Sequence, residues 1–141
     1  MRLNHINLCS SDVAALAQKL ERHFGYRTVD AGTVPDVPGL AGAGTAFAML
    51  IGRDGSNIVI SQIEAPAGSA YPPQFHFGLI QESPEAVHAK HAELTAAGLE
   101  PGRINGPFDV LGARWTAFTC PLGDGLEVEI NHRTGSALLD G

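Results

Sequence analysis

Three residues of the 141-residue sequence have the side chains of a catalytic metal site: His5, His76 and Glu127. Each lies in a segment with the pattern of a β-strand, and the inward-pointing side chains of neighbouring strands converge in a curved sheet. Two imidazoles and one carboxylate suit a divalent ion of Fe, Mn, Co, Ni or Zn. Such a set leaves coordination positions open for water and substrate, as a catalytic metal requires. They form a metal site only if the fold of the chain brings them together.

Each of these residues also has an ordinary structural explanation when it is considered alone. A single histidine on a strand is more often a satisfied polar residue than a metal ligand. Glu127 or Glu129 could simply lie on a solvated strand face. The residues indicate a site only if the strands that carry them occupy equivalent places in a repeated fold.

The first half of the chain has the pattern of a strand, a helix and three further strands. Apolar and polar residues alternate in the strands, and apolar residues recur at helical spacing between good N-cap residues and Gly25. An Asp-Gly pair marks the turn of a hairpin. The predicted elements are a strand at 3–9, a helix at 12–24, a strand at 26–30, a glycine-rich loop at 31–44, and strands at 45–51 and 57–63.

The second half repeats this order. Ser83 is the expected N-cap of its helix, with Pro84 at the first helical position, and Gly98 ends it. The predicted strands are 75–80, 108–110, 113–120 and 126–132. The sequence thus predicts an α+β protein of two tandem βαβββ modules whose curved mixed sheets form a cleft. The expected boundaries are 1–64 for the first module, 65–73 for a linker, 74–133 for the second module and 134–141 for a C-terminal tail.

The composition limits the classes of function. Apolar residues make up 44% of the chain, which is enough for a domain of this length to bury a core. The formal net charge is -6, with nine Lys and Arg and no basic run, so binding to nucleic acid or to an anionic membrane is not expected. No apolar stretch approaches the ~20 residues of a membrane span, and no signal peptide is visible. We expect a cytoplasmic protein that binds a small molecule.

Several motifs together resemble the vicinal-oxygen-chelate superfamily, which includes glyoxalase I, fosfomycin-resistance proteins, extradiol dioxygenases and bleomycin-resistance proteins. No single motif is specific, but their order and spacing match over nearly the whole chain. The motifs are the opening strand and helix start at 3–12, the first helix end at 24–26, the second metal strand at 76–79, the second helix end at 94–98, and the turn and strand at 121–128.

The resemblance implies that His5, His76 and Glu127 bind a divalent metal. Glu129 points to the same face of an ideal strand as Glu127, so a bulge or slip could exchange them. The resemblance also implies a homodimer, with a cleft built within one chain or from the modules of two chains.

The sequence departs from glyoxalase I at the last strand of the first half. Glyoxalase I has a further carboxylate there, which is both ligand and catalytic base, whereas Ser61 or Gln62 stands in its place here. This difference argues against glyoxalase I activity. A fosfomycin-type activity lacks an obvious cluster of phosphonate-binding cations, since Arg103, Arg114 and Arg133 are scattered in the sequence.

Gln62, Arg114 and Trp115 are candidates for contact with the substrate. Arg114 and Trp115 are equally explained as a surface cation beside a core aromatic residue. His132 is a candidate acid or base, although an exposed histidine at a strand end is the plainer explanation. The catalytic residue therefore remains unassigned.

The favoured function is a metal-dependent enzyme with lyase, isomerase or dioxygenase chemistry. Its substrate would be a small molecule that chelates the metal through adjacent oxygens. The alternative is a non-catalytic binding protein of the bleomycin-resistance type, and a third hypothesis is a family member with a vestigial site. Retention of all three candidate ligands favours the enzyme.

Overall fold

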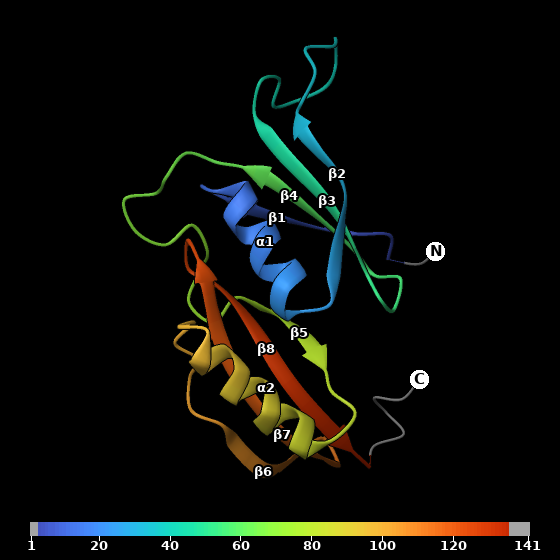
Figure 1. Cartoon of the computed structure of the whole chain (residues 1–141), viewed down its shortest axis with the longest axis vertical. Helices are drawn as coiled ribbons and strands as arrows, with labels where there is room; N and C mark the ends of the chain where they lie inside the picture. Colours follow the sequence, from blue (N-terminus) through green and yellow to red (C-terminus); the bar gives the residue numbers. More distant parts are fainter. Residues whose placement is uncertain (1–2, 136–141) are drawn as a thin grey trace. The chain divides into compact units, whose positions relative to one another are not determined.

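A computed structural model describes residues 3–135, and the chain divides into two compact units, Met1–Ala70 and Tyr71–Gly141. Each unit contains one helix and a four-stranded mixed sheet, so the predicted α+β fold of two βαβββ modules is confirmed (Figure 1). The elements of the first unit are β1 (Ile6–Ser10), α1 (Val13–His23), β2 (Tyr26–Thr33), β3 (Ala46–Gly52) and β4 (Asn57–Gln62). Those of the second unit are β5 (His76–Ile80), α2 (Pro84–Ala96), β6 (Asn105–Val110), β7 (Ala113–Gly123) and β8 (Leu126–Thr134).

The first sheet has the strand order β1-β4-β3-β2, with β1 and β4 parallel and the other pairs antiparallel. Asp12 begins α1 as its N-cap, because its Oδ1 accepts a hydrogen bond from the Ala15 N–H at 2.9 Å. The buried face of α1, which includes Leu16 and Leu20, packs on the sheet beside Leu8 and Ile60. The core of this unit therefore lies between its helix and one sheet face.

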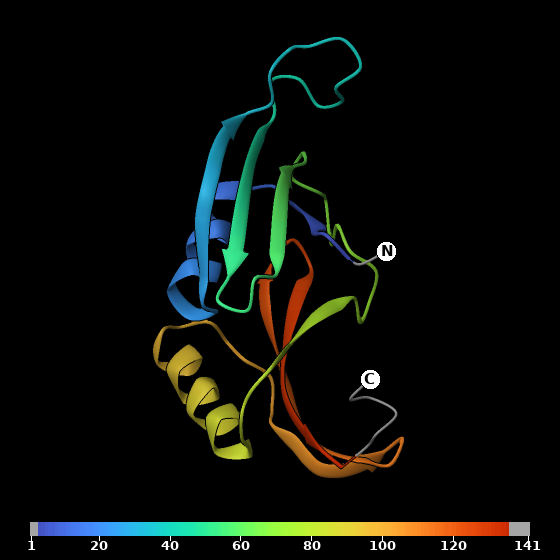
Figure 2. The same cartoon turned by 90° about the vertical axis from the view of Figure 1, so that its right-hand side faces the viewer.

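Two boundaries in the first unit differ from the prediction. β1 begins at Ile6 and not at residue 3, so His5 precedes the strand. The side-chain amide of Asn57 donates to the Asn4 carbonyl at 3.3 Å, which holds this entry segment beside β4. The second difference is that β2 continues to Thr33, because its backbone pairs with β3 past the predicted end. The loop between β2 and β3 projects beyond both strands (Figure 2).

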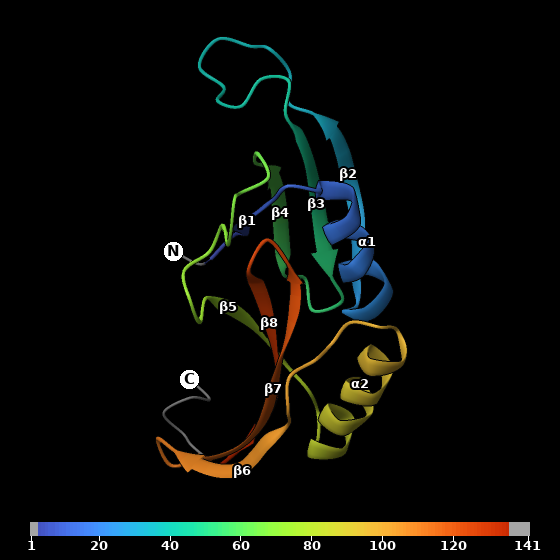
Figure 3. The same cartoon turned by 90° about the vertical axis from the view of Figure 1, so that its left-hand side faces the viewer.

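The second sheet repeats this arrangement with the order β5-β8-β7-β6, in which β5 and β8 are parallel. Ser83 caps α2 by accepting from the Ala86 N–H at 3.1 Å. The helix packs on β7 and β8, with Val87 and Leu94 fully buried. His91 of α2 stacks edge-to-face on Phe118 of β7, with ring centroids 4.9 Å apart. In each unit the helix covers one face of its own sheet, and no described helix of that unit covers the other (Figures 1 and 3).

The predicted linker at 65–73 falls between β4 and β5, and the predicted tail at 134–141 starts at the last residue of β8. Residues 136–141 of that tail lie outside the described part of the chain. Among residues 3–135, neither helix has the length and apolar character required to cross a membrane.

Candidate metal site

The alternation of residues along β8 creates a polar sheet face in the second unit. Leu126, Val128 and Ile130 are buried on the side of the sheet that α2 covers. Because side chains alternate along a strand, Glu127 and Glu129 lie on the opposite face. We call this opposite side the open face of the second sheet.

His76 joins these residues from the first position of β5. Its partner in the parallel register is Glu127, and Gly78 is the partner of Glu129. Paired residues point to the same side of a sheet, so one imidazole and two carboxylates share the open face. The His76 side chain is 40% exposed, which leaves it accessible to an ion or a ligand.

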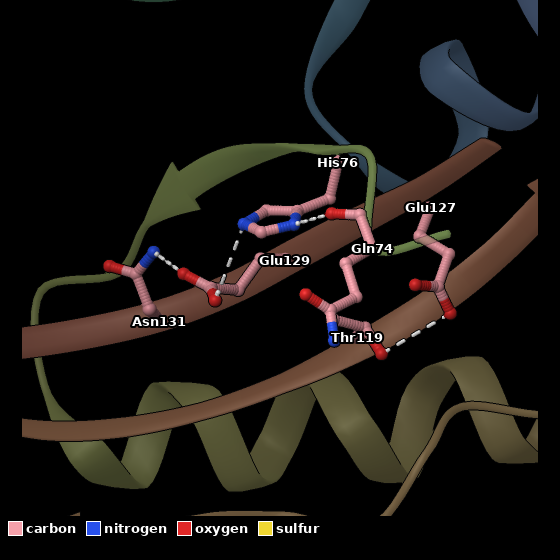
Figure 4. A network of polar contacts seen from close by, with 6 residues as sticks. All are labelled: Gln74, His76, Thr119, Glu127, Glu129 and Asn131. Carbon is pink, nitrogen blue, oxygen red and sulfur yellow. Dashed lines mark hydrogen bonds and ion pairs between the residues drawn. The ribbon is translucent and has the colours of Figure 1, made fainter. Parts of the chain in front are cut away.

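A backbone carbonyl determines which nitrogen of His76 carries the proton. Its Nδ1 lies 2.8 Å from the carbonyl oxygen of Gln74, the residue two positions earlier (Figure 4). A carbonyl oxygen can only accept a hydrogen bond, so Nδ1 must donate. In the neutral imidazole this leaves Nε2 with its lone pair, which is the form that binds a metal.

Glu129 is the carboxylate that Nε2 of His76 faces. Its Oε2 lies 3.7 Å from that nitrogen, and its Oε1 accepts a hydrogen bond from Asn131 Nδ2 at 2.7 Å (Figure 4). Gly78 lies against this pair, because a Cβ built on it would lie 3.3 Å from Asn131 Nδ2 and 3.9 Å from Glu129 Oε1. Asn131 and Gly78 therefore orient a carboxylate beside the imidazole.

Glu127 has a different partner, although it is the residue beside His76 in the register. Its Oε1 accepts a long hydrogen bond of 3.4 Å from Thr119 Oγ1 on β7 (Figure 4). The weak bond leaves the carboxylate available for another partner. Two carboxylates with separate supports thus flank one imidazole.

The third candidate ligand, His5, belongs to the first unit. It is exposed just before β1, and its Nδ1 lies 3.3 Å from Asn4 Oδ1. The predicted set therefore takes one member from the first unit and two from the second. Within residues 3–135 the structure contains no cluster of three or more His, Cys, Asp or Glu side chains arranged to hold one ion.

The residues that replace the glyoxalase I carboxylate both have partners within the first unit. Ser61 Oγ donates to Asn7 Oδ1 at 3.0 Å. The Gln62 side-chain oxygen accepts from the Ala46 N–H at 2.7 Å and so holds the start of β3 against β4. The Gln62 oxygen thus has a structural role, and its contact with a substrate stays a prediction.

The remaining candidates lie on different faces of the second sheet. Trp115 is on the open face, whereas its neighbour Arg114 is exposed and pairs with Asp109 at 3.7 Å. His132 is on the side that α2 covers, with its Nδ1 donating to the Gln81 carbonyl at 2.9 Å.

Asn131 and Gly78 belong to this site, although neither is predicted from the sequence. The alternation of β8 places Asn131 on the same face as Glu129, and this is the signal that could have identified it. No local pattern singles out Gly78, because its role arises from the close approach of a neighbouring strand.

His76, Glu127 and Glu129 have the donor types that bind divalent metal ions, although the described residues do not gather three such side chains around one point. The imidazole is fixed in the ligating tautomer by a hydrogen-bonded outer partner of the kind that metal-bound histidines use.

Fold and site together define a protein of two βαβββ modules that presents histidine and carboxylate side chains on an open sheet face. The family model described as Glyoxalase/Bleomycin resistance protein/Dioxygenase superfamily matches residues 2–130. The chain belongs to this superfamily. No protein of curated function matches the sequence significantly.

Solved structures have the same fold along nearly the whole chain. One described as a possible glyoxalase from Bacillus cereus is 25% identical, with a TM-score of 0.64, and the match covers 92% of this chain and 97% of that one. The fosfomycin resistance protein FosX from Listeria monocytogenes, complexed with Mn(II) and sulfate ion, is 17% identical, with a TM-score of 0.65 and coverage of 97% and 94%. A glyoxylase/bleomycin resistance protein/dioxygenase domain from Frankia sp. EAN1pec is 16% identical, with a TM-score of 0.67 and coverage of 96% and 98%.

Proposed function

We propose that this protein is a metal-dependent enzyme that binds a divalent ion through His5, His76 and Glu127. Its substrate is a small molecule that offers adjacent oxygens, and the reaction belongs to the lyase, isomerase or dioxygenase classes found in the superfamily. The observation that carries the proposal is the His76 tautomer: with Nδ1 donating to the Gln74 carbonyl, Nε2 offers its lone pair on the same face as Glu127 and Glu129.

A divalent ion bound there would act as a Lewis acid toward the substrate oxygens. The chain's own residues would orient the metal-binding side chains in two ways. The Gln74 carbonyl keeps the proton on Nδ1 of His76, and Asn131 holds one oxygen of Glu129 so that the other faces the imidazole.

Mn(II) is the first ion to test, because the structurally similar FosX from Listeria monocytogenes is complexed with Mn(II). The low identity to FosX gives no support for the same substrate. The homodimer expected from the resemblance also remains part of the proposal and is checked by sedimentation equilibrium.

The deciding experiment measures bound metal by elemental analysis after purification without chelator. We expect near-stoichiometric metal in the native protein and its loss in His5→Ala and His76→Ala. The matched control is His88→Ala, which removes an exposed histidine from α2 of the second unit and should keep the metal.

Absence of metal from the native protein, even after incubation with Fe(II), Mn(II), Co(II), Ni(II) and Zn(II), would reject the enzyme hypothesis. The non-catalytic small-molecule binding protein would then be the leading explanation. Metal that persists in His5→Ala would instead limit the site to donors of the second unit.

A further inference from the structure

The open face of the second sheet contains a buried hydrogen-bond donor that the metal site does not use. The indole Nε1 of Trp115 is buried and has no hydrogen-bond partner among residues 3–135. Buried N–H groups nearly always have an acceptor, because leaving one unsatisfied costs free energy. Trp115 is therefore the residue on this face that most needs a partner from outside the sheet.

Trp115 has two neighbours that can bind a ligand. It pairs with Arg133 of β8 and with Phe108 of β6, so the three side chains share the open face. The guanidinium carbon of Arg133 lies 5.7 Å from the centre of the indole ring, within the range of a cation–π contact. Phe108 is 43% exposed, although exposure of a large aromatic side chain to water is unfavourable.

The charges of this group select the ligand. The Trp115 indole and the Arg133 guanidinium both donate hydrogen bonds, and neither can accept one. None of the three paired side chains is a carboxylate. An oxygen-rich anion would supply the missing acceptor and would meet a positive charge.

Trp115, Arg133 and Phe108 share the open face with the second-unit residues of the proposed metal site. Arg133 follows Glu129 by four residues on β8, which corresponds to about 13 Å along a strand. Glu127 and Glu129 repel an anion at their end of the face, whereas Arg133 attracts one at the other end. A ligand that spans the face would therefore place its own anionic group beside Trp115.

We propose that Trp115, Arg133 and Phe108 form a subsite for a carboxylate or phosphate group carried on a flat apolar body. A ligand oxygen accepts from Trp115 Nε1 and from Arg133, and the apolar body covers Phe108. The indole Nε1 is buried, so a ligand reaches it only after a side chain moves. The inference rests on the proposed function only for the use of this face by a small molecule, and its test needs no metal.

Trp115 is the only tryptophan of the chain, so its fluorescence reports directly on the subsite. Chelator-treated protein is titrated with phenylacetate, with phenyl phosphate and with the neutral phenylacetamide. We expect a saturable change with at least one anion and about tenfold or weaker binding of the amide, because the amide lacks the charge-assisted hydrogen bond. The two anions distinguish a carboxylate from a phosphate preference.

Variants separate the subsite from general charge effects. Arg133→Gln should weaken binding of the preferred anion about tenfold or more, whereas Arg22→Gln, the same change at an exposed position of α1 in the first unit, should leave it within about twofold. Trp115→Phe, followed by calorimetry, should weaken binding as well, because phenylalanine cannot donate.

The proposal is overturned if neither anion changes the fluorescence saturably, or if the amide binds as tightly as the acids. These comparisons use the native protein, so they hold even if Arg133→Gln does not fold. A protein that binds no metal but still binds the anion would reject the proposed function and keep the subsite.

Discussion

The Nε2 atom of His76 lies 3.7 Å from Oε2 of Glu129, although the residue paired with His76 in the strand register is Glu127. The two carboxylates differ in their hydrogen-bond partners. Glu129 is held by Asn131 and faces the imidazole, whereas Glu127 has only a long hydrogen bond from Thr119. A carboxylate with a strong outer partner is oriented in advance, as ligating carboxylates usually are, whereas the weakly held Glu127 is the residue that the register places beside His76.

Replacing the two carboxylates one at a time tests which is the ligand. Glu127→Gln should abolish stoichiometric Mn(II) binding, because one of the three proposed metal ligands is lost. Glu129→Gln should weaken binding by about 10–100-fold, as expected for an outer partner of a bound ion. Titration of Mn(II), followed by its paramagnetic resonance signal, measures both. If the order of the two effects is reversed, Glu129 is the ligand and Glu127 its neighbour.

Gly78→Ala tests the space that the carboxylate network needs. The new Cβ would approach Asn131 Nδ2 at 3.3 Å, closer than a comfortable contact, so Asn131 must shift by a few tenths of an ångström. We expect Mn(II) affinity to fall by about tenfold, since Asn131 then orients Glu129 less well. Circular dichroism should show an unchanged fold.

Gly68→Ala is the control for this change, because a Cβ at that position meets nothing within 4 Å. It should leave Mn(II) affinity unaltered. Equal affinities of Gly78→Ala and the native protein would mean that the network has no part in metal binding.

The starts of the helices and the β3–β4 hairpin could be predicted because their signals are local. Asp12 and Ser83 each accept from the N–H three residues later, as their side chains and positions predict. The strand of 31–33 could not be predicted in the same way. Its residues read as the start of a loop, but pairing of the backbone with β3 satisfies their hydrogen bonds regardless of side-chain type.

In the candidate site, too, some features follow from the local sequence and others from contacts between strands. Alternation along β8 places Glu127 and Glu129 on one face, and this follows from the sequence. Which carboxylate turns toward His76 depends on Asn131 and on the absence of a side chain at Gly78, a residue of the neighbouring strand. The side-chain angles of Glu129 depend on contacts between two strands, so the sequence pattern of either strand alone cannot predict them.

The two helix caps should each contribute to stability. Asp12→Ala and Ser83→Ala remove the acceptor for a first-turn N–H group, so each should lower the free energy of unfolding by about 1 kcal/mol. Urea unfolding followed by circular dichroism measures the change. Asp12→Asn and Ser83→Asp keep a capping acceptor and should retain most of the stability. A loss as large in these conservative variants would exclude capping as the cause.

The hairpin between β3 and β4 should make stability depend on pH in the acid range. Asp54 Oδ1 accepts hydrogen bonds from Ser56 Oγ at 2.7 Å and from Ser56 N at 3.0 Å. These bonds favour the charged form, first through the Ser56 side chain and then through its backbone, and they lower the pKa of Asp54 below its ordinary value of 3.8. A carboxylate whose pKa is lower in the folded state stabilises the fold at pH values above the unfolded pKa.

The contribution of Asp54 should therefore be complete above about pH 5 and disappear as the pH falls through its folded pKa. Urea unfolding of the native protein and of Asp54→Asn across this range should give a difference in stability that is constant near neutral pH and shrinks in acid. Ser56→Ala supplies the matched test, because it removes the largest cause of the shift and should raise the Asp54 pKa toward its ordinary value in a carboxyl titration by NMR. An Asp54 pKa that is the same in Ser56→Ala and in the native protein would show that the Ser56 hydroxyl does not stabilise the charge.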